Sequence, residues 1–213
     1  MSILKLSNVT KAYGNKNVLE HFSLEVFQGE FVAITGSSGS GKSTLLNILG
    51  LIEPIDSGTY TILGVENPKI DSKESVQLLR NKISYLFQNF ALVNERTVGY
   101  NLEIALRFSG ASRTRKKELI SKALNQVGLP GVENKKVFQL SGGEQQRVAL
   151  ARIILKPSEI ILADEPTGSL DLGNRDNVMD ILAQLNYEGK TVIVVTHDPN
   201  VEKCAKRIIR LDE

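Results

Sequence analysis

Tryptophan is absent from this 213-residue sequence, and cysteine occurs once, at Cys204. A single cysteine excludes an internal disulfide bond, as is typical of proteins in a reducing cytoplasm, and we interpret Cys204 as an inert thiol. Long apolar runs are also missing, since none approaches the ~20 residues that a membrane-spanning helix needs. The first five residues, Met1–Lys5, lack the apolar region of a secretory signal. We therefore expect that the chain does not enter a membrane by itself.

The sequence also lacks a large excess of charge of either sign. Its 26 Lys and Arg residues nearly balance its 24 Asp and Glu residues, for a net charge of +2. This balance favours neither a surface that coats nucleic acid nor a strongly acidic one, and we expect no nucleic-acid partner. The basic stretch Arg113–Lys117 is predicted to be the solvated start of a helix. Length and a hydrophobic content of 41% predict one globular domain, 1–213.

Hydrophobic patterns predict two kinds of strand. Apolar and polar residues alternate at 22–26 and around 60–62, which is typical of half-buried strands. The runs 31–35, 159–163 and 191–196 are apolar on both faces, as in central strands of a parallel sheet covered by helices. Between about 90 and 156 the patterns become mostly helical, and the proline at 157 is expected to close the last helix. One helix is predicted from the 3.6-residue spacing of Leu119, Ala123, Gln126 and Val127.

A glycine-rich segment follows the first of these buried runs and fits the phosphate-binding pattern G-x-x-x-x-G-K-[ST]. It leads directly into an apolar helix at 45–49. Glycines let the backbone curl so that successive N–H groups point at phosphate oxygens, and the helix N-terminus adds partial positive charge. Lys42 is expected to reach the β- and γ-phosphates, and the Ser43 hydroxyl to bind Mg²⁺. The alternative is a Gly/Ser-rich turn that matches by accident. The candidate ATP-binding residues here are Gly36, Ser37, Ser38, Gly39, Ser40, Gly41, Lys42, Ser43 and Thr44.

Two carboxylates end the buried run 159–163. In this Walker B pattern Asp164 is placed to hold Mg²⁺, and Glu165 to orient and partly deprotonate an attacking water. The alternative is an acidic N-cap for the following helix. We predict an α/β fold: a P-loop NTPase core with a mostly parallel sheet, an antiparallel β edge lobe and an inserted helical lobe. The core and edge lobe are expected at about 1–88 and 157–213, and the helical lobe at about 89–156.

The stretch Leu140-Ser141-Gly142-Gly143-Glu144 resembles the signature of ABC transporter ATPases, whose usual form is Leu-Ser-Gly-Gly-Gln. Ser141 and Glu144 also form a capping-box pattern that would start a helix running to Leu155, and both interpretations can hold together. The resemblance implies that this helix start faces the γ-phosphate bound by the opposite subunit. The expected donors are Ser141 and Gly143, with Gly142 beside them.

Four further residues resemble family positions in the expected order. Tyr13 resembles the aromatic residue that stacks on adenine, and Gln88 the Q-loop glutamine that senses Mg²⁺ and the γ-phosphate. Asp171 resembles the D-loop aspartate that communicates across the dimer, and His197 the switch histidine. The implied catalytic set is Glu165, His197, Gln88 and Lys42, and the implied metal set is Ser43, Gln88 and Asp164. His21 has no such support and is interpreted as an ordinary residue.

The resemblance covers essentially the whole chain and implies an ATP- and Mg²⁺-dependent ATPase. It would act in a head-to-tail dimer with a second copy or a homologous ATPase subunit. It would sit on the cytoplasmic face of the cell membrane, attached through an integral membrane permease. Residues 163–171 and 143–147 look similar to the branch that exports lipoproteins, macrolides, bacteriocins or antimicrobial peptides and that has a cell-division relative. We expect the cargo to be a peptide, lipoprotein or hydrophobic drug, and the sequence does not name it.

Two departures from that branch stand out. The segment Phe90–Val98 lacks a proline common there, and the chain stops at Glu213, from which we expect no regulatory C-terminal domain. The segment Phe90–Tyr100 is predicted to receive a coupling helix of the permease at Leu92 and Val93, unless these side chains pack inside the helical lobe.

Three other functions were weighed against this prediction. A small-molecule kinase has no use for the signature. A DNA-repair ATPase of this family would need a long coiled-coil insertion, for which the stretch 89–139 is too short. A motor that drives a mechanical or signalling membrane partner would look the same as an exporter's motor, so this alternative stays open.

Overall fold

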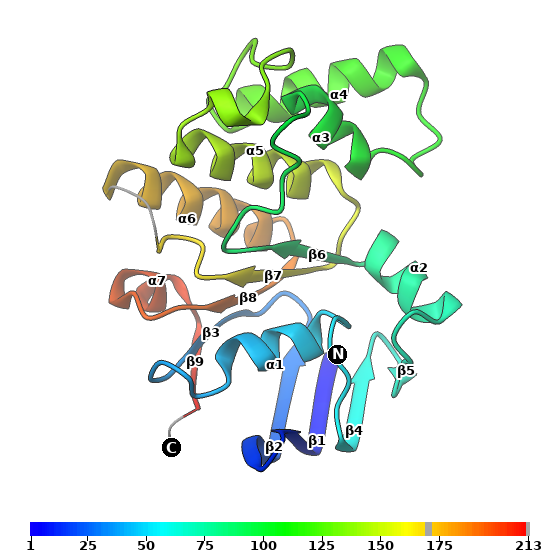
Figure 1. Ribbon diagram of the computed structural model, residues 1–213, viewed down its shortest axis with the longest axis vertical. Coiled ribbons are helices and arrows are strands. Elements are labelled where there is room, and N and C mark those ends of the chain that lie inside the picture. Colours follow the sequence, from blue (N-terminus) through cyan, green and yellow to red (C-terminus); the bar gives the residue numbers. More distant parts are fainter. Residues whose placement is uncertain (169–171, 212–213) are drawn as a thin grey trace.

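Two β-sheets form the framework of the protein (Figure 1). The computed structural model describes residues 1–168 and 172–211. The larger sheet is parallel and has the strand order β6-β7-β8-β3-β9. The smaller sheet is antiparallel and has the order β2-β1-β4-β5. The strands are β1 Ser2–Tyr13, β2 Lys16–Phe27, β3 Phe31–Thr35, β4 Ser57–Ile62, β5 Val65–Glu66, β6 Ile83–Leu86, β7 Ile160–Asp164, β8 Thr191–Val195 and β9 Arg207–Arg210.

Helices cover the parallel sheet on both faces and form a separate lobe at one end (Figure 1). α1 lies between the two sheets in the view, whereas α5 and α6 cover the opposite face of the parallel sheet. α3 and α4 pack against α5 on the side away from that sheet. No helix in the described ranges is long and apolar enough to cross a membrane. The helices are α1 Lys42–Leu49, α2 Lys73–Asn81, α3 Val98–Ala105, α4 Arg113–Gln126, the 3-10 helix η1 Val137–Gln139, α5 Gly142–Leu155, α6 Leu172–Tyr187 and α7 Pro199–Cys204.

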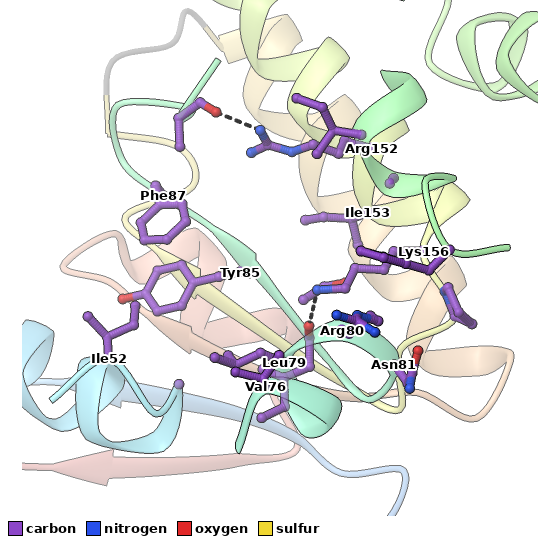
Figure 2. A pocket seen from close by; sticks show the side chains of 18 of the residues that line it. Ile52, Val76, Leu79, Arg80, Asn81, Tyr85, Phe87, Arg152, Ile153 and Lys156 are labelled. Carbon is purple, nitrogen blue, oxygen red and sulfur yellow. Dashed lines mark hydrogen bonds between the residues drawn. The ribbon is translucent and has the colours of Figure 1, made fainter. Parts of the chain in front are cut away.

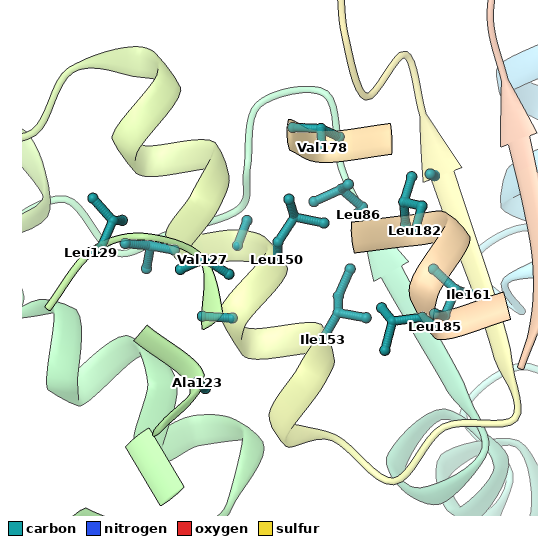
Figure 3. Packing of buried hydrophobic residues seen from close by; sticks show 14 of the residues in the cluster. Leu86, Ala123, Val127, Leu129, Leu150, Ile153, Ile161, Val178, Leu182 and Leu185 are labelled. Carbon is teal, nitrogen blue, oxygen red and sulfur yellow. The ribbon is translucent and has the colours of Figure 1, made fainter. Parts of the chain in front are cut away.

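The central strands are buried on both faces because two hydrophobic cores meet at the sheet. Along β8, Val192 and Val194 enter the core shared with α5 and α6, which Figure 3 shows from close by. The intervening Ile193 and Val195 enter the core shared with α1 and the antiparallel sheet. β7 alternates in the same way. This double burial is the reason that these runs read as continuously apolar, and the predicted fold class is confirmed.

The predicted elements differ from the observed ones mainly at their ends. The run predicted at 159–163 is the strand Ile160–Asp164, and the run predicted at 191–196 ends at Val195. The strand that precedes Gln88, β6, ends at Leu86. In α4, Gln126 is exposed, and Leu124 takes the buried position instead.

The start of β3 is tied to the end of α6 by one side chain. The Asn186 amide donates to the carbonyl oxygens of Gly29 at 3.1 Å, Glu30 at 3.2 Å and Lys190 at 2.8 Å. These carbonyls belong to the β2–β3 turn and to the turn that leads into β8. Asn186 therefore fixes the entry of two neighbouring strands that end at the candidate site.

We expect Asn186→Ala to lower the free energy of unfolding by about 1–3 kcal/mol, because it leaves three carbonyls without a shared donor. Gln184→Ala is the matched control on the same helix. The Gln184 amide donates a hydrogen bond to the exposed side chain of Glu188. Loss of this hydrogen bond should change the free energy of unfolding by less than ~0.5 kcal/mol. Urea denaturation measures both, and equal losses would contradict the role assigned to Asn186.

Candidate functional site

Four of the predicted site segments gather at one edge of the parallel sheet because parallel strands end on the same side. β3 leads into the glycine-rich loop, β7 ends at Asp164, and His197 comes shortly after β8. Gln88 follows β6, which pairs with β7. Four segments far apart in the sequence are thereby brought to one edge.

The glycine-rich loop curls around the ammonium group of Lys42. Lys42 Nζ donates to the carbonyl oxygens of Gly36 at 2.8 Å and Ser37 at 2.6 Å. α1 begins with Gly41 as its N-cap, and no side chain caps its first N–H groups. These groups and the helix dipole favour an anion at this position. Ser37, Ser38 and Gly39 are exposed, and the Ser40 hydroxyl is buried without a partner in the described ranges.

Gly41 is held against a strand of the other sheet. Its φ of +96° lies in the left-handed region, and a Cβ there would come within 2.7 Å of Val18 Cγ1 and 2.9 Å of the Val18 carbonyl oxygen. Only glycine fits this close approach without displacing β2. The antiparallel sheet therefore helps to set the shape of the loop.

Ser43 and Asp164 bring the loop and the end of β7 together. Ser43 Oγ donates to Asp164 Oδ1 at 3.4 Å. Burial and the neighbouring Glu165 carboxylate raise the pKa of Asp164, while the Ser43 hydrogen bond and the Lys42 charge oppose that rise. The site thus holds negative charge that its own cations do not fully offset.

Glu165 and His197 form a second contact pair. His197 Nδ1 lies 2.8 Å from Glu165 Oε1, and the imidazole is 70% exposed while the carboxylate is 14% exposed. Glu165 has a φ of +45°, a conformation that costs a non-glycine residue of order 1–3 kcal/mol. Its other oxygen, Oε2, is buried without a partner in the described ranges. The carboxylate is therefore held in place with one oxygen still able to accept a proton.

Tyr13 lies beside the start of α1. Its hydroxyl lies 3.5 Å from Thr44 Oγ1 and donates to Glu53, and the hydrogen bond to Glu53 raises the pKa of the phenol. Tyr13 is 49% exposed, and Lys11 Nζ lies 5.5 Å from the centroid of its ring. Gln88 is also exposed. Asp171 lies outside the described residues.

Ser141 is not part of this edge cluster. Its hydroxyl accepts from the Glu144 backbone N–H at 3.3 Å, and the Glu144 side chain accepts from the Ser141 N–H at 2.8 Å. The predicted capping box is therefore present at the start of α5. α5 packs on the opposite face of the sheet from α1, so Ser141 and Lys42 come from different layers (Figure 1).

Sequence reasoning missed two residues that shape the site. Val18 is one, because its approach to Gly41 depends on how the two sheets pack. The other is Gln146, which is 3% exposed and donates through Nε2 to the carbonyl oxygen of Pro166, directly after Glu165. The signal for Gln146 was a polar residue at a core-facing position of α5, two residues before the buried Val148.

Comparison with known proteins agrees with this arrangement. Residues 19–168 match the ABC transporter family model. The chain is 40% identical to the "macrolide export ATP-binding/permease protein MacB" of Mannheimia succiniciproducens over 100% of this chain and 34% of that protein. It is 40% identical to the protein of the same name from Neisseria meningitidis serogroup B, covering 99% and 33%. The chain thus spans about a third of these relatives.

Solved structures show the same fold at full length. The ATP-binding cassette MJ0796, in a dimeric post-hydrolysis state bound to ADP and Pi, is 40% identical with a TM-score of 0.89, covering 97% of this chain and 93% of that one. A second dimeric MJ0796 structure gives a TM-score of 0.90 at 41% identity. The chain therefore belongs to the ABC transporter family as an ATP-binding cassette, and the predicted ATPase class is confirmed.

We expect Gly41→Ala to lower the free energy of unfolding by about 1–3 kcal/mol more than Gly39→Ala, because overpacking against Val18 adds to backbone strain. Gly39 is the matched control: its φ of +81° strains an alanine similarly, but its Cβ would meet nothing within 4 Å. Both are measured by urea denaturation without nucleotide. Val18→Ala should recover part of the Gly41→Ala loss, and its failure to do so would contradict the close approach.

Proposed function

We propose that this cassette hydrolyses MgATP in a head-to-tail dimer and thereby drives an integral membrane permease on the cytoplasmic face of the cell membrane. The observation that carries the proposal is the Glu165–His197 pair beside Asp164 and the glycine-rich loop. The printed names of the relatives join an ATP-binding part to a permease part, which supports a permease as partner. By the same likeness we propose export of a peptide, lipoprotein or hydrophobic drug.

The donor groups fit Mg²⁺ with ATP. Ser43 and Asp164 present the hard oxygen ligands that Mg²⁺ prefers, and Gln88 offers an amide oxygen at the same edge. Burial, and after it the neighbouring Glu165 carboxylate, raises the pKa of Asp164, and a cation bound there would offset this cost of the charged form. When bound, the ion neutralises charge on the phosphates. Lys42 and the N–H groups of the loop hold the phosphate chain, and the exposed Tyr13 is proposed to stack on the adenine.

Glu165 is proposed to take a proton from the attacking water. The positive φ of Glu165 turns this side chain away from the ordinary course of a strand. His197 is proposed to hold the carboxylate and to contact the γ-phosphate.

A second cassette is proposed to complete each site. The first N–H groups of α5 have no partner within the helix, and the α5 N-terminus attracts negative charge. Because Ser141 lies in a different layer from Lys42, it is available to a phosphate held by another copy. Solved MJ0796 cassettes are dimeric, which supports this arrangement.

The permease is proposed to dock in a groove between the helical lobe and the core. The groove has a cavity of about 530 Å³ (Figure 2). Four of its apolar side chains are exposed: Ile52, Val76, Ile104 and Phe108. On its wall the rings of Tyr85 and Phe87 stack with centroids 4.1 Å apart, directly before Gln88.

This groove replaces the docking position expected from the sequence. Leu92 packs against the core of the helical lobe, so a charge there would test folding instead of docking. Val93 is 45% exposed, but of the segment Phe90–Tyr100 only Ala91 lines the cavity. Docking in the groove still places the partner close to Gln88, because the preceding residue, Phe87, lines the groove.

Glu165→Gln should reduce turnover by about 10²–10⁴-fold, because the amide keeps its size but cannot accept a proton. ATP binding should survive, so that the variant accumulates as an ATP-bound dimer in size-exclusion chromatography. Glu159→Gln is the control at the other end of β7, where the carboxylate pairs with Lys82, and it should hydrolyse normally. A Glu165→Gln protein that stays monomeric with ATP or turns over normally contradicts the assignment.

Ser141→Arg should block dimer closure and hydrolysis while each subunit still binds ATP. Ser112→Arg is the matched control, because Ser112 is likewise an exposed N-cap that accepts from the backbone three residues on. Each replacement should cost about 1 kcal/mol of stability through the lost cap. ATPase per folded molecule and ATP-dependent dimerisation in the Glu165→Gln background separate the two. Equal behaviour would leave Ser141 with a capping role alone.

A further inference from the structure

The docking groove carries positive charge without any acidic residue on its lining. Arg80, Arg152 and Lys156 line it, and no Asp or Glu does so among the described residues. Some cations elsewhere in the described residues do have a carboxylate partner, as Lys11 has Asp56 at 3.0 Å and Lys82 has Glu159. An apolar groove with unbalanced cations is unusual, because charges removed from water need a counter-charge.

Two of the three cations, Arg152 and Arg80, make contacts within the chain that hold neighbouring groups in place. Arg152 donates to the carbonyl oxygens of Ala91 at 2.6 Å and Phe90 at 2.8 Å. Both residues have positive φ, 46° and 64°, so the guanidinium holds a strained segment in place. The Arg80 guanidinium lies 3.7 Å from the centroid of the Phe108 ring, where the ring face attracts it.

Lys156 has an uncharged partner, as the two arginines do, and it is the one ammonium group among the three cations. Its ammonium donates to the carbonyl oxygen of Ile83, and the described residues offer it no carboxylate within salt-bridge distance. Burial and the charge of Arg152 lower its pKa to about 8. Figure 2 shows Lys156 reaching from α5 across the cavity toward the end of α2 and the start of β6.

We propose that the docking segment of the permease carries an Asp or Glu whose carboxylate pairs with Lys156 while its apolar side chains contact Ile104 and Phe108. This inference rests on the proposed docking in the groove and adds its charge requirement. A carboxylate there supplies the counter-charge that the chain itself lacks, and a pair shielded from water is stronger and more selective than one at the rim. Partners that present a neutral or basic residue at this position are disfavoured.

The test uses the cassette with the permease that co-purifies with it, reconstituted in lipid nanodiscs. A carbodiimide joins a lysine amine to a contacting carboxylate with loss of water and no spacer. Mass spectrometry is expected to find Lys156 joined to one Asp or Glu of the permease. The matched variant Lys156→Arg keeps the charge but not the amine, so it should lose the cross-link while stimulation of the ATPase by the permease persists.

Lys156→Met should raise the permease concentration for half-maximal stimulation by about tenfold or more, because it strands the partner's carboxylate. Lys156→Glu should abolish stimulation, and exchanging the cross-linked carboxylate for lysine in the permease should restore it. Thermal unfolding of the isolated cassette shows whether each variant folds. Wild-type stimulation in Lys156→Met, or cross-links that bypass Lys156, overturns the charge pair.

Phe108→Glu separates this inference from the proposed docking itself. If the groove receives the permease, Phe108→Glu removes stimulation, while Tyr187→Glu, at an 88% exposed aromatic residue on the far end of α6, does not. Loss with Phe108→Glu but not with Lys156→Met keeps the groove and rejects the carboxylate. Full stimulation in Phe108→Glu rejects the groove as the docking site, and the charge pair with it.

Discussion

Burial of the central strands on both faces is the constraint on which the rest of the structure depends. β3, β7 and β8 have almost no exposed surface, so polar chemistry is excluded from the sheet and is confined to the loops at its ends. Because the strands are parallel, those loops come together at one edge. The Ser43–Asp164 and Glu165–His197 contacts follow from this geometry, since each joins loops after strands that are neighbours or next neighbours in the sheet.

The same layering supports the proposal that a second cassette completes each site. The sheet separates α1, which begins at the phosphate-binding loop, from α5, which begins at Ser141. Two helix N-termini that each favour an anion are therefore present in every chain but cannot meet on one phosphate within it. In the proposed head-to-tail pair they would meet twice. The proposed need for a partner thus follows from how two hydrophobic cores divide the chain.

Local features were predictable from the sequence, and contacts between distant segments were not. The strand–loop–helix around Lys42 and the Ser141–Glu144 capping box depend on residues a few positions apart, and both are observed. Strand ends were displaced by a residue because the hydrogen-bond register with a neighbour sets them. Val18 against Gly41 and Arg152 on the strained Phe90–Ala91 segment depend on tertiary packing that no local pattern encodes.

Those distant contacts are also the ones that join the nucleotide edge to the groove. Gln146 bonds the carbonyl oxygen that follows Glu165, and six residues later on the same helix Arg152 holds the segment after Gln88. Lys156, which caps the C-terminal end of α5, lines the groove. α5 thus bonds the backbone next to Glu165 at one point and lines the proposed docking groove near its other end. Packed cores shift between discrete arrangements instead of deforming gradually. A displacement of α5 or of the Phe87–Gln88 segment when ATP is cleaved would therefore change the shape of the groove. The proposed charge pair at Lys156 would resist separation of the permease until α5 moves.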